Sequence, residues 1–384
     1  LVELGTHLNL KRNVHLQLAL ECSKRTSGMT PELLTNQYAN VERFFSKEVI
    51  YDWAERTVGI EHLEGWVERK FVSGGYAAVR AFGARGVHVV AGNSPGVSML
   101  TIGQDAITRS DAIIKAPSND PLTAVAIART MIEMAPDHPI TKHISVAYWK
   151  GGDEVVEEAL YQPKNIEKLV AWGGFASVTH IAKYVQPGID LITLDPKLSS
   201  TIIGKDAFAS EDAMAEAAVR LANDVGCSNQ EGCVNARVIY IQTGTDKAGI
   251  ETANRFGKMV YEEIQALPGH VSGPIKALPT DLADEIAGLK FSPGLYKVTG
   301  GTGAGGVIVS QTDEPVEFAR ILGGRVANLV PVDDLNTPIK AVNAYTQTIG
   351  IFPEALKAEI RDLLGIQGAQ RLVSLGYATG GPYA

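Results

Sequence analysis

Five short apolar runs decide the fold: GVHVVAG (residues 86–92), DAIIKAP (111–117), ISVAYW (144–149), KLVAWGG (168–174) and DLITLD (190–195). Each run is followed by a turn and then by a longer stretch with helical spacing, such as PLTAVAIARTMIEMA or GDEVVEEALY. This alternation predicts an α/β fold with a parallel sheet. Strands this apolar are expected to be covered on both faces. The order is typical of a doubly wound, Rossmann-type nucleotide-binding domain, with ligand sites at the carboxyl ends of the strands.

The segment before these runs, residues 1–75, is predicted to be helical. HLQLALECSKR has helical apolar spacing, and Thr30 is a good cap for a helix that starts at Pro31. We expect these helices to form a packing or oligomerisation layer.

A second α/β unit is predicted after the five runs. Its elements are a helix near 210–224, the stretch CSNQEGCVNARVIYIQ, a helix around 246–266, and strands at GGVIVS and RVANLVPV. The chain has 384 residues, and single cores stop growing near about 250–300 residues, so two domains are expected. We place the helical layer and the dinucleotide-binding domain at residues 1–225, and a cysteine-bearing catalytic domain with a C-terminal return segment at 226–384. A nucleophile near this boundary would lie at the interdomain cleft.

Composition excludes several classes of protein. The formal net charge of -8 argues against a nucleic-acid partner, which would need a clustered basic surface. No apolar segment approaches the roughly 18–20 residues that span a bilayer, and the N-terminus does not read as a signal sequence, so a cytoplasmic protein without membrane insertion is expected. The chain starts at Leu1 and stops at GGPYA, and we treat both termini as incomplete.

The chain contains three cysteines, Cys22, Cys227 and Cys233. This sparse, odd set predicts neither a disulfide framework nor a CxxC metal site, and no metal is assigned. Cys233 ends the turn Gln230-Glu231-Gly232-Cys233 and is followed by VNARVIYIQ, a predicted strand. It is either a small buried hydrophobe or a nucleophile presented on a tight turn. Cys22 and Cys227 are interpreted as packing residues.

Two polar residues close predicted strands. Asn93, in Asn-Ser-Pro-Gly directly before a helix, could donate to an oxyanion, or it could only form an Asx-turn. Lys115, at the end of DAIIK, could hold the ribose or phosphate of a dinucleotide, or it could be an ordinary solvated lysine.

Glycine-rich turns and histidines give weaker signals. Trp172-Gly173-Gly174 lies where a phosphate-contacting turn is expected, but it is no GxGxxG fingerprint. VTGGTGAGGV (298–307) does not end in GK[ST], and we interpret it as a flexible connection or a hairpin. His180 and His270 are interpreted as structural, because neither lies in a recognisable nucleophile pattern.

In order, these elements resemble the aldehyde dehydrogenase superfamily, and within it the acyl-CoA reductases typified by the fatty-acid reductase of bacterial luminescence. Asn93-Ser94-Pro95 looks like the family's Asn-x-Pro element, and IIKAPSNDPLTA like its lysine-containing strand end. VAWGGFASV is similar to its cofactor-loop motif, and NQEGC matches its catalytic-cysteine motif. The resemblance spans about residues 86–350.

The resemblance implies a role for each of these residues. Cys233 would be the nucleophile, and the Asn93 side chain with the Cys233 backbone N–H would form the oxyanion hole. Lys115 would contact the cofactor ribose, and Trp172, Gly173 and Gly174 would belong to the cofactor loop. Ser118 stands where many NAD-preferring relatives carry a glutamate, which leaves room for a 2′-phosphate. NADPH is therefore the expected cofactor, with NADH possible.

One departure from the family pattern concerns water. Hydrolytic relatives carry Glu-Leu-Gly-Gly-Lys where this chain has ITLDPK, and alignment on Lys197 puts Thr193 at the glutamate position. A threonine hydroxyl is no general base near neutral pH, so exchange with a thiol is favoured over release to water. Thr193 is accordingly grouped with the cofactor-binding residues. The family's later glutamate motif is also absent, since that stretch reads GGRVANLVPV.

The resemblance implies NADPH-dependent reduction of an acyl thioester, either acyl-CoA or acyl-carrier protein, to an aldehyde through a covalent acyl-cysteine. One alternative is NAD(P)-dependent oxidation of an aldehyde to a free acid, with Glu231 as the nearest candidate base. Another is a non-catalytic subunit that retains the fold. A homo-oligomer is expected.

Overall fold

The computed structural model describes residues 1–194 and 197–380 and shows two compact units, which we describe separately. The first unit extends to residue 196, and the second begins at Lys197. The sequence placed the boundary later, between residues 225 and 226. That position falls inside the second unit because strand β8 (Leu198–Ile203) pairs with β9 (Ala236–Ile241), and helix α12 (Glu211–Gly226) packs into the same core.

The first unit contains a five-stranded parallel sheet, as predicted. Its strands are β3 (Arg85–Val89), β4 (Asp111–Lys115), β5 (Ile144–Ala147), β6 (Lys168–Trp172) and β7 (Asp190–Leu194). Their order in the sheet is β5-β4-β3-β6-β7, so the chain moves outward from β3 in one direction and then in the other. The order therefore reverses beside β3, which is where ligands bind in open sheets of this kind.

Helices cover both faces of this sheet. They are α7 (Pro95–Thr108), α8 (Thr123–Met134) and the short α9 (Pro139–Lys142), together with α10 (Glu154–Leu160) and α11 (Phe175–Ala182). Ile114 packs with α7 and α8 in one core, while Val87 and Leu169 pack with α11 in another. The doubly wound prediction is confirmed. The prediction that every strand is covered on both faces was wrong for the edge strand β7, where Ile192 is 45% exposed.

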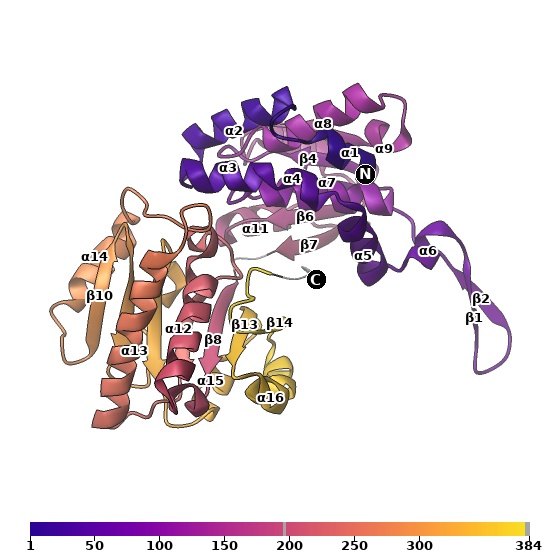
Figure 1. Cartoon of the computed structure of the whole chain (residues 1–384). Coiled ribbons are helices and arrows are strands. Elements are labelled where there is room, and N and C mark those ends of the chain that lie inside the picture. The colour runs from indigo at the N-terminus through magenta and orange to yellow at the C-terminus, as the bar shows by residue number, and fades with distance from the viewer. Residues whose placement is uncertain (195–196, 381–384) are drawn as a thin grey trace. The chain divides into compact units, whose positions relative to one another are not determined.

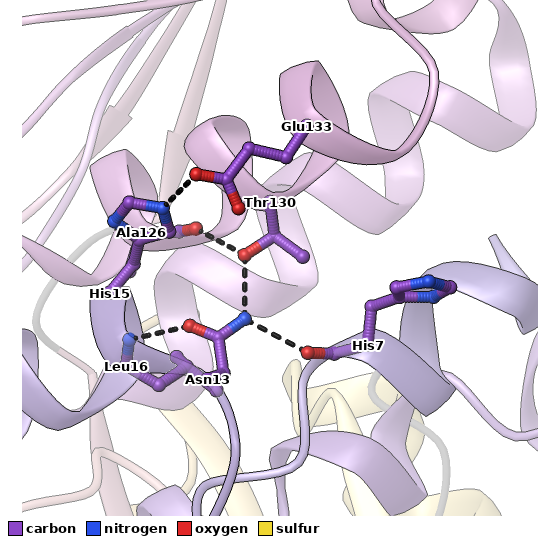
Figure 2. Close-up of polar contacts among 7 residues, drawn as sticks. All are labelled: His7, Asn13, His15, Leu16, Ala126, Thr130 and Glu133. Atoms are coloured by element: carbon purple, nitrogen blue, oxygen red, sulfur yellow. Dashed lines mark hydrogen bonds and ion pairs between the residues drawn. The ribbon is translucent and has the colours of Figure 1, made fainter.

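The chain opens with six helices: α1 (Val2–His7), α2 (Val14–Thr26), α3 (Pro31–Ala39), α4 (Val41–Phe44), α5 (Lys47–Thr57) and α6 (Ile60–Glu64). Helices α1 to α5 share a hydrophobic core with α7 and α8. Figure 2 shows the polar contacts of this interface: Asn13 caps α2 at the N–H of Leu16 and donates to Thr130 on α8 at 2.8 Å. His15 on α2 pairs with Glu133 on α8 at 2.7 Å. The helical layer is thus an integral part of the first unit.

The prediction of helix up to residue 75 was wrong from Val67 onward. Strands β1 (Val67–Lys70) and β2 (Tyr76–Val79) pair antiparallel as a hairpin around a turn that contains two glycines. The hairpin stands apart from the rest of the first unit (Figure 1). Aromatic side chains along it and beside it are exposed: Trp66 61%, Phe71 53%, Tyr76 67% and Phe82 69%.

The second unit contains a seven-stranded sheet in the order β10-β11-β12-β9-β8-β13-β14. Besides β8 and β9, its strands are β10 (Tyr296–Thr302), β11 (Gly305–Ser310), β12 (Val326–Pro331), β13 (Thr346–Phe352) and β14 (Arg371–Ser374). Among the described strands of this sheet, β10 and β11 alone pair antiparallel, so the VTGGTGAGGV stretch forms part of a hairpin, one of the two predicted alternatives.

The helices of the second unit pack against this sheet. Besides α12 they are α13 (Lys247–Ala266), α14 (Thr280–Leu289), α15 (Asn336–Ala341) and α16 (Glu354–Gln367), with short 3₁₀ turns η1 (Lys205–Phe208), η2 (Cys227–Gln230) and η3 (Ala319–Ile321). Helices α12 and α13 lie side by side (Figure 1) and contribute to one hydrophobic core. Within the described residues, no helix combines the length and the apolar character that crossing a membrane requires.

Candidate active site

The backbone that leads to Cys233 is strained. Ser228, Asn229 and Gln230 have φ angles of 53°, 56° and 63°, which is the left-handed region. Non-glycine residues there cost of order 1–3 kcal/mol each and persist only where surrounding contacts impose the conformation. Such strain clusters at functional sites.

Buried hydrogen bonds impose this conformation. The Oδ1 atom of Asn229 accepts from Ser272 Oγ at 3.1 Å and from the Gly273 N–H at 2.8 Å. The side chain of Gln230 donates to the Val326 carbonyl at 2.9 Å and accepts from the Val326 N–H at 2.9 Å. Both side chains are almost fully buried, so the turn is held from inside the second unit.

Cys233 itself lies on a turn immediately before β9, as predicted, and is partly buried. Its carbonyl accepts a 2.7 Å hydrogen bond from Ser199 Oγ on β8, and the preceding Gly232 N–H donates to Asn235 Oδ1 at 3.0 Å. The backbone is therefore fixed on both sides of the thiol. Cys227 is also partly buried, so exposure alone does not separate these two thiols.

In the first unit, Asn93 lies in the turn between β3 and α7. Ser94 follows as the cap of α7, its Oγ accepting from the Gly96 N–H at 3.1 Å, and Pro95 occupies the first helical position. The Asn93 side chain is partly buried. It is thus placed at the N-terminal end of a helix, where backbone N–H groups favour negative charge.

The turn after β4 contacts the Asn93 turn directly. Asn119 Nδ2 donates to the Gly92 carbonyl at 3.0 Å. From the other side, Thr26 on α2 donates to the Asn119 carbonyl at 2.8 Å. The next residue, Asp120, is buried and accepts from Thr123 Oγ1 at 2.5 Å. The helical layer thereby holds the turn that carries Ser118, which is exposed.

Lys115 is a buried lysine at the end of β4, only 8% exposed. Its Nζ lies 5.8 Å from the ring centre of Tyr148 and 5.6 Å from that of Trp149. Burial lowers the pKa of Lys115, and the negative charge of Glu157 raises it. A buried cation at the carboxyl end of a parallel strand is suited to an anionic or polar ligand, unlike the solvated lysine of the alternative interpretation.

The negative charge of Glu157 compensates the positive charge of Lys115. Its side chain accepts hydrogen bonds from Trp149 Nε1 at 3.3 Å, from the Gly152 N–H at 3.2 Å and from Tyr184 OH at 3.2 Å, and pairs with His180 Nε2 at 2.5 Å. Burial raises the pKa of Glu157, but the hydrogen bonds outweigh it and the pKa is lowered. His180 therefore has a carboxylate partner 23 residues away, which no local pattern could reveal.

The remaining predicted residues lie on neighbouring strands. Trp172 ends β6, Gly173 follows it, and Gly174 caps α11. Gly173 has a φ of 150°, a conformation that L side chains rarely adopt, so this position requires glycine. Thr193 is exposed on β7, paired with Ala171. Residues 195 and 196 of ITLDPK lie outside the described residues.

The structure thus places the first-unit candidates together at the carboxyl ends of the sheet's strands. Asn93, Lys115, Trp172 and Gly173 follow or end the adjacent strands β3, β4 and β6. Cys233 belongs to the second unit. Sequence reasoning missed Asn119, Glu157 and Ser199, whose roles depend on partners distant in the chain. Among the described residues, no cluster of three or more histidine, cysteine or acidic side chains could hold a metal.

These features define a chain with the aldehyde dehydrogenase fold. Aldehyde dehydrogenase 21 from Physcomitrella patens, solved with the product succinate, superposes with a TM-score of 0.72 at 13% identity, covering 98% of this chain and 77% of that one. The NADP-dependent glyceraldehyde-3-phosphate dehydrogenase from Bacillus halodurans, complexed with NADP, gives a TM-score of 0.67 at 14% identity, covering 97% and 77%. At such identities the likeness shows the fold alone.

The chain belongs to the acyl-CoA reductase (LuxC) family, whose pattern matches residues 10–382. The long-chain acyl-protein thioester reductase of Photorhabdus luminescens is 29% identical over 338 residues, which cover 86% of this chain and 65% of the relative. The long-chain acyl-protein thioester reductase of Vibrio harveyi is 25% identical over 339 residues, covering 86% and 66%. The chain thus spans about two thirds of the length of these relatives.

Proposed function

We propose that this protein reduces an acyl thioester to an aldehyde, with Cys233 as the acyl acceptor and NADPH as the reductant. The observation that carries the proposal is the placement of Cys233 at the end of a strained turn whose backbone is fixed on both sides. Membership of the acyl-CoA reductase family supports the same chemistry.

The first half of the proposed reaction is acyl transfer. The Cys233 thiolate attacks the thioester carbonyl, the carbon–sulfur bond to the carrier breaks, and the carrier thiolate leaves and takes a proton. The acyl group is now a thioester of the enzyme. A bound nicotinamide cofactor supplies the hydride that reduces this carbonyl. Collapse of the resulting thiohemiacetal releases the aldehyde and restores the Cys233 thiolate, so that covalent capture divides one difficult reaction into easier steps.

Negative charge develops on the carbonyl oxygen in both halves of the reaction. We assign its stabilisation to the Asn93 side-chain amide and to the backbone N–H of Cys233. Each donor aimed at such an oxyanion lowers the activation free energy by about 3–4 kcal/mol. The location of Asn93 at the start of α7 supports this assignment, because the helix N-terminus favours the same charge.

The first-unit residues fit a nicotinamide cofactor. The edge of the sheet offers the buried cation of Lys115 and a glycine turn at Gly173, where a phosphate can approach the backbone closely. We assign Lys115 to the cofactor ribose and Trp172, Gly173 and Gly174 to the cofactor loop, with Thr193 beside them. Ser118 is small, neutral and exposed, which leaves room for a 2′-phosphate and favours NADPH over NADH.

Thr193 supports aldehyde as the product. It occupies the position where hydrolytic relatives carry their glutamate base, and its hydroxyl does not activate water near neutral pH. Glu231, on the nucleophile turn, is the residue that oxidation to a free acid would require as a base.

The proposal extends to the setting of the enzyme. The substrate carrier is coenzyme A or an acyl-carrier protein, and a reducing cytoplasm suits a reactive thiol. We also propose a homo-oligomer, because Trp66, Phe71 and Tyr76 are more than half exposed on or directly beside the β1–β2 hairpin. Light scattering on the purified protein measures the assembly, and a monomer would contradict this part.

The proposed function is tested by NADPH oxidation with a panel of acyl-CoA thioesters, with the aldehyde trapped and identified. Wild type is compared with Cys233→Ala and with the matched thiol variant Cys227→Ala. Aldehyde from wild type and Cys227→Ala, but none from Cys233→Ala, is the expected result. Free acid made from aldehyde and NAD(P)⁺ would favour oxidation instead, and no turnover in either direction would favour a non-catalytic subunit.

A further inference from the structure

The guanidinium of Arg237, on β9, donates hydrogen bonds to backbone carbonyls of the turn that carries Cys233. Its Nη1 donates to the Asn235 carbonyl at 3.1 Å and to the Gly232 carbonyl at 3.4 Å. Its Nη2 donates to the carbonyls of Gln230 and Gly232, each at 3.4 Å. These acceptors lie on both sides of Cys233 in the chain, so one side chain spans the whole turn.

The remaining nitrogen of this guanidinium anchors the turn to a second segment. Nε donates to the Leu322 carbonyl at 2.9 Å, in the loop that precedes β12. A planar fork of donors is unique to arginine, because lysine offers only a compact ammonium and glutamine is neutral. The carbonyls of the turn are therefore oriented by a charged group for which no other side chain is a full substitute.

The charge matters as well as the hydrogen bonds. Burial lowers the pKa of Arg237, and the negative charges of Cys233 and Glu231 raise it. The Arg237 guanidinium therefore lies within electrostatic range of the Cys233 side chain. Glu231 is the competing anion, since it lies on the same turn and interacts with the same cation.

We propose that Arg237 is a positioning residue for Cys233, which both orders the nucleophile turn and keeps a positive charge beside the thiolate. This inference rests on the proposed function only in its choice of Cys233 as nucleophile. It does not depend on the cofactor, on the acyl carrier or on the direction of the reaction.

The test measures the reactivity of Cys233 without substrate. In a Cys22→Ser, Cys227→Ser background, the rate of alkylation by iodoacetamide is followed by mass spectrometry from about pH 5 to about pH 9, the range in which activated thiols ionise. Arg237→Gln keeps two donors and loses the charge, whereas Arg237→Lys keeps the charge and loses the fork. Arg361→Gln, which removes a 64% exposed arginine from α16, is the matched control.

Arg237→Gln is expected to shift the alkylation profile to higher pH and to slow the reaction near neutral pH by about tenfold, because fewer thiols are ionised. Arg237→Lys should recover most of the profile, and Arg361→Gln should not change it. A wild-type profile in Arg237→Gln would overturn the proposal. So would a Lys variant as impaired as the Gln variant, since that would leave the charge without a role.

Glu231→Gln keeps the proposal testable if Arg237→Gln does not fold. Glu231 is exposed, so its replacement leaves the core intact. Removing the competing anion should speed alkylation on the acid side of the profile, and an unchanged profile would contradict the proposed role of the charge. If alkylation behaves as expected while NADPH and acyl-CoA give no turnover, the proposed function fails and the role of Arg237 stands.

Discussion

The side chain of Asn119 donates a 3.0 Å hydrogen bond to the carbonyl of Gly92, joining the turns that follow two neighbouring strands. Gly92 immediately precedes Asn93, and Asn119 immediately follows Ser118. A residue assigned to the oxyanion and a residue assigned to the cofactor are thus separated from this contact by one peptide each. A displacement of the turn that carries Ser118 can therefore change the position of the turn that carries Asn93.

Replacing Gly92 should disturb Asn93 without unfolding the protein. A β-carbon at this position would lie 1.8 Å from Asn119 Oδ1, so Gly92→Ala must displace the Asn119 side chain and break its hydrogen bond. We expect turnover of acyl-CoA to fall by about tenfold or more, since small displacements of a catalytic group have large kinetic effects. Gly151→Ala is the control, because a β-carbon there meets nothing within 4 Å. Equal rates in both variants would exclude this coupling.

Asn93→Ala should lower the turnover number by on the order of 10²–10³ while the melting temperature changes little. The reason is the loss of the N–H donor that we assign to the developing oxyanion. Asn93→Asp is nearly isosteric but does not have the amide donor, and it should be as slow as the alanine variant. Full activity in the aspartate variant would show that the amide donates nothing that the reaction needs.

Ser118→Glu should reverse the cofactor preference. The turn is exposed, so the fold tolerates the change, while a carboxylate there repels a 2′-phosphate and can accept from ribose hydroxyls. The ratio of kcat/KM for NADPH to that for NADH is expected to fall by about tenfold or more. Ser118→Gln, which has similar size and no charge, separates charge from bulk. If both variants keep the wild-type ratio, Ser118 does not face the 2′ position.

Stability should depend on pH through Asp224, a buried carboxyl on α12 that accepts from the N–H groups of Gly376 and Ala378 at 2.9 Å each. Burial raises the pKa of Asp224 from 3.8 to about 6. Between these values the folded protein binds more protons than the unfolded chain, so this contribution to stability is greatest in acid and is lost as pH rises through about 6.

Urea unfolding of wild type and Asp224→Asn at several pH values checks this prediction. The variant should be less stable, because one backbone N–H loses its acceptor, an effect of about 1–3 kcal/mol. The gap between the two proteins should narrow as pH rises through about 6, since only wild type titrates there. A gap that stays constant with pH would mean that Asp224 has an ordinary pKa.

The elements of the fold could be predicted because their signals are local. Runs such as KLVAWGG identify buried parallel strands by composition, and the intervening helices follow from their spacing. The β1–β2 hairpin escaped prediction because VERK and YAAV are short and mostly exposed, so no apolar alternation marks them. The unit boundary was misplaced because pairing of β8 with β9 joins segments on either side of α12.

The candidate site could be predicted only as far as motifs reach. Asn93, Lys115 and Cys233 stand in short patterns at the ends of predicted strands or on a turn before one. The residues that hold them do not, since Asn119 acts on a carbonyl 27 positions away and Ser199 on one 34 positions away. Such contacts exist only after folding. The left-handed backbone before Cys233 could not be predicted either, because those positions hold serine, asparagine and glutamine and no glycine marks the conformation.

That left-handed backbone has a consequence for laboratory evolution. Glycine adopts the left-handed region without penalty, so Ser228→Gly should relieve strain that Ser228→Ala would retain. Selection for heat resistance would therefore favour glycine at residue 228, and selection for catalytic rate would restore a bulkier residue that limits the motion of the turn. Variants from the two selections should therefore carry different residues at position 228. The residue found there would show whether stability or catalytic rate was selected more strongly.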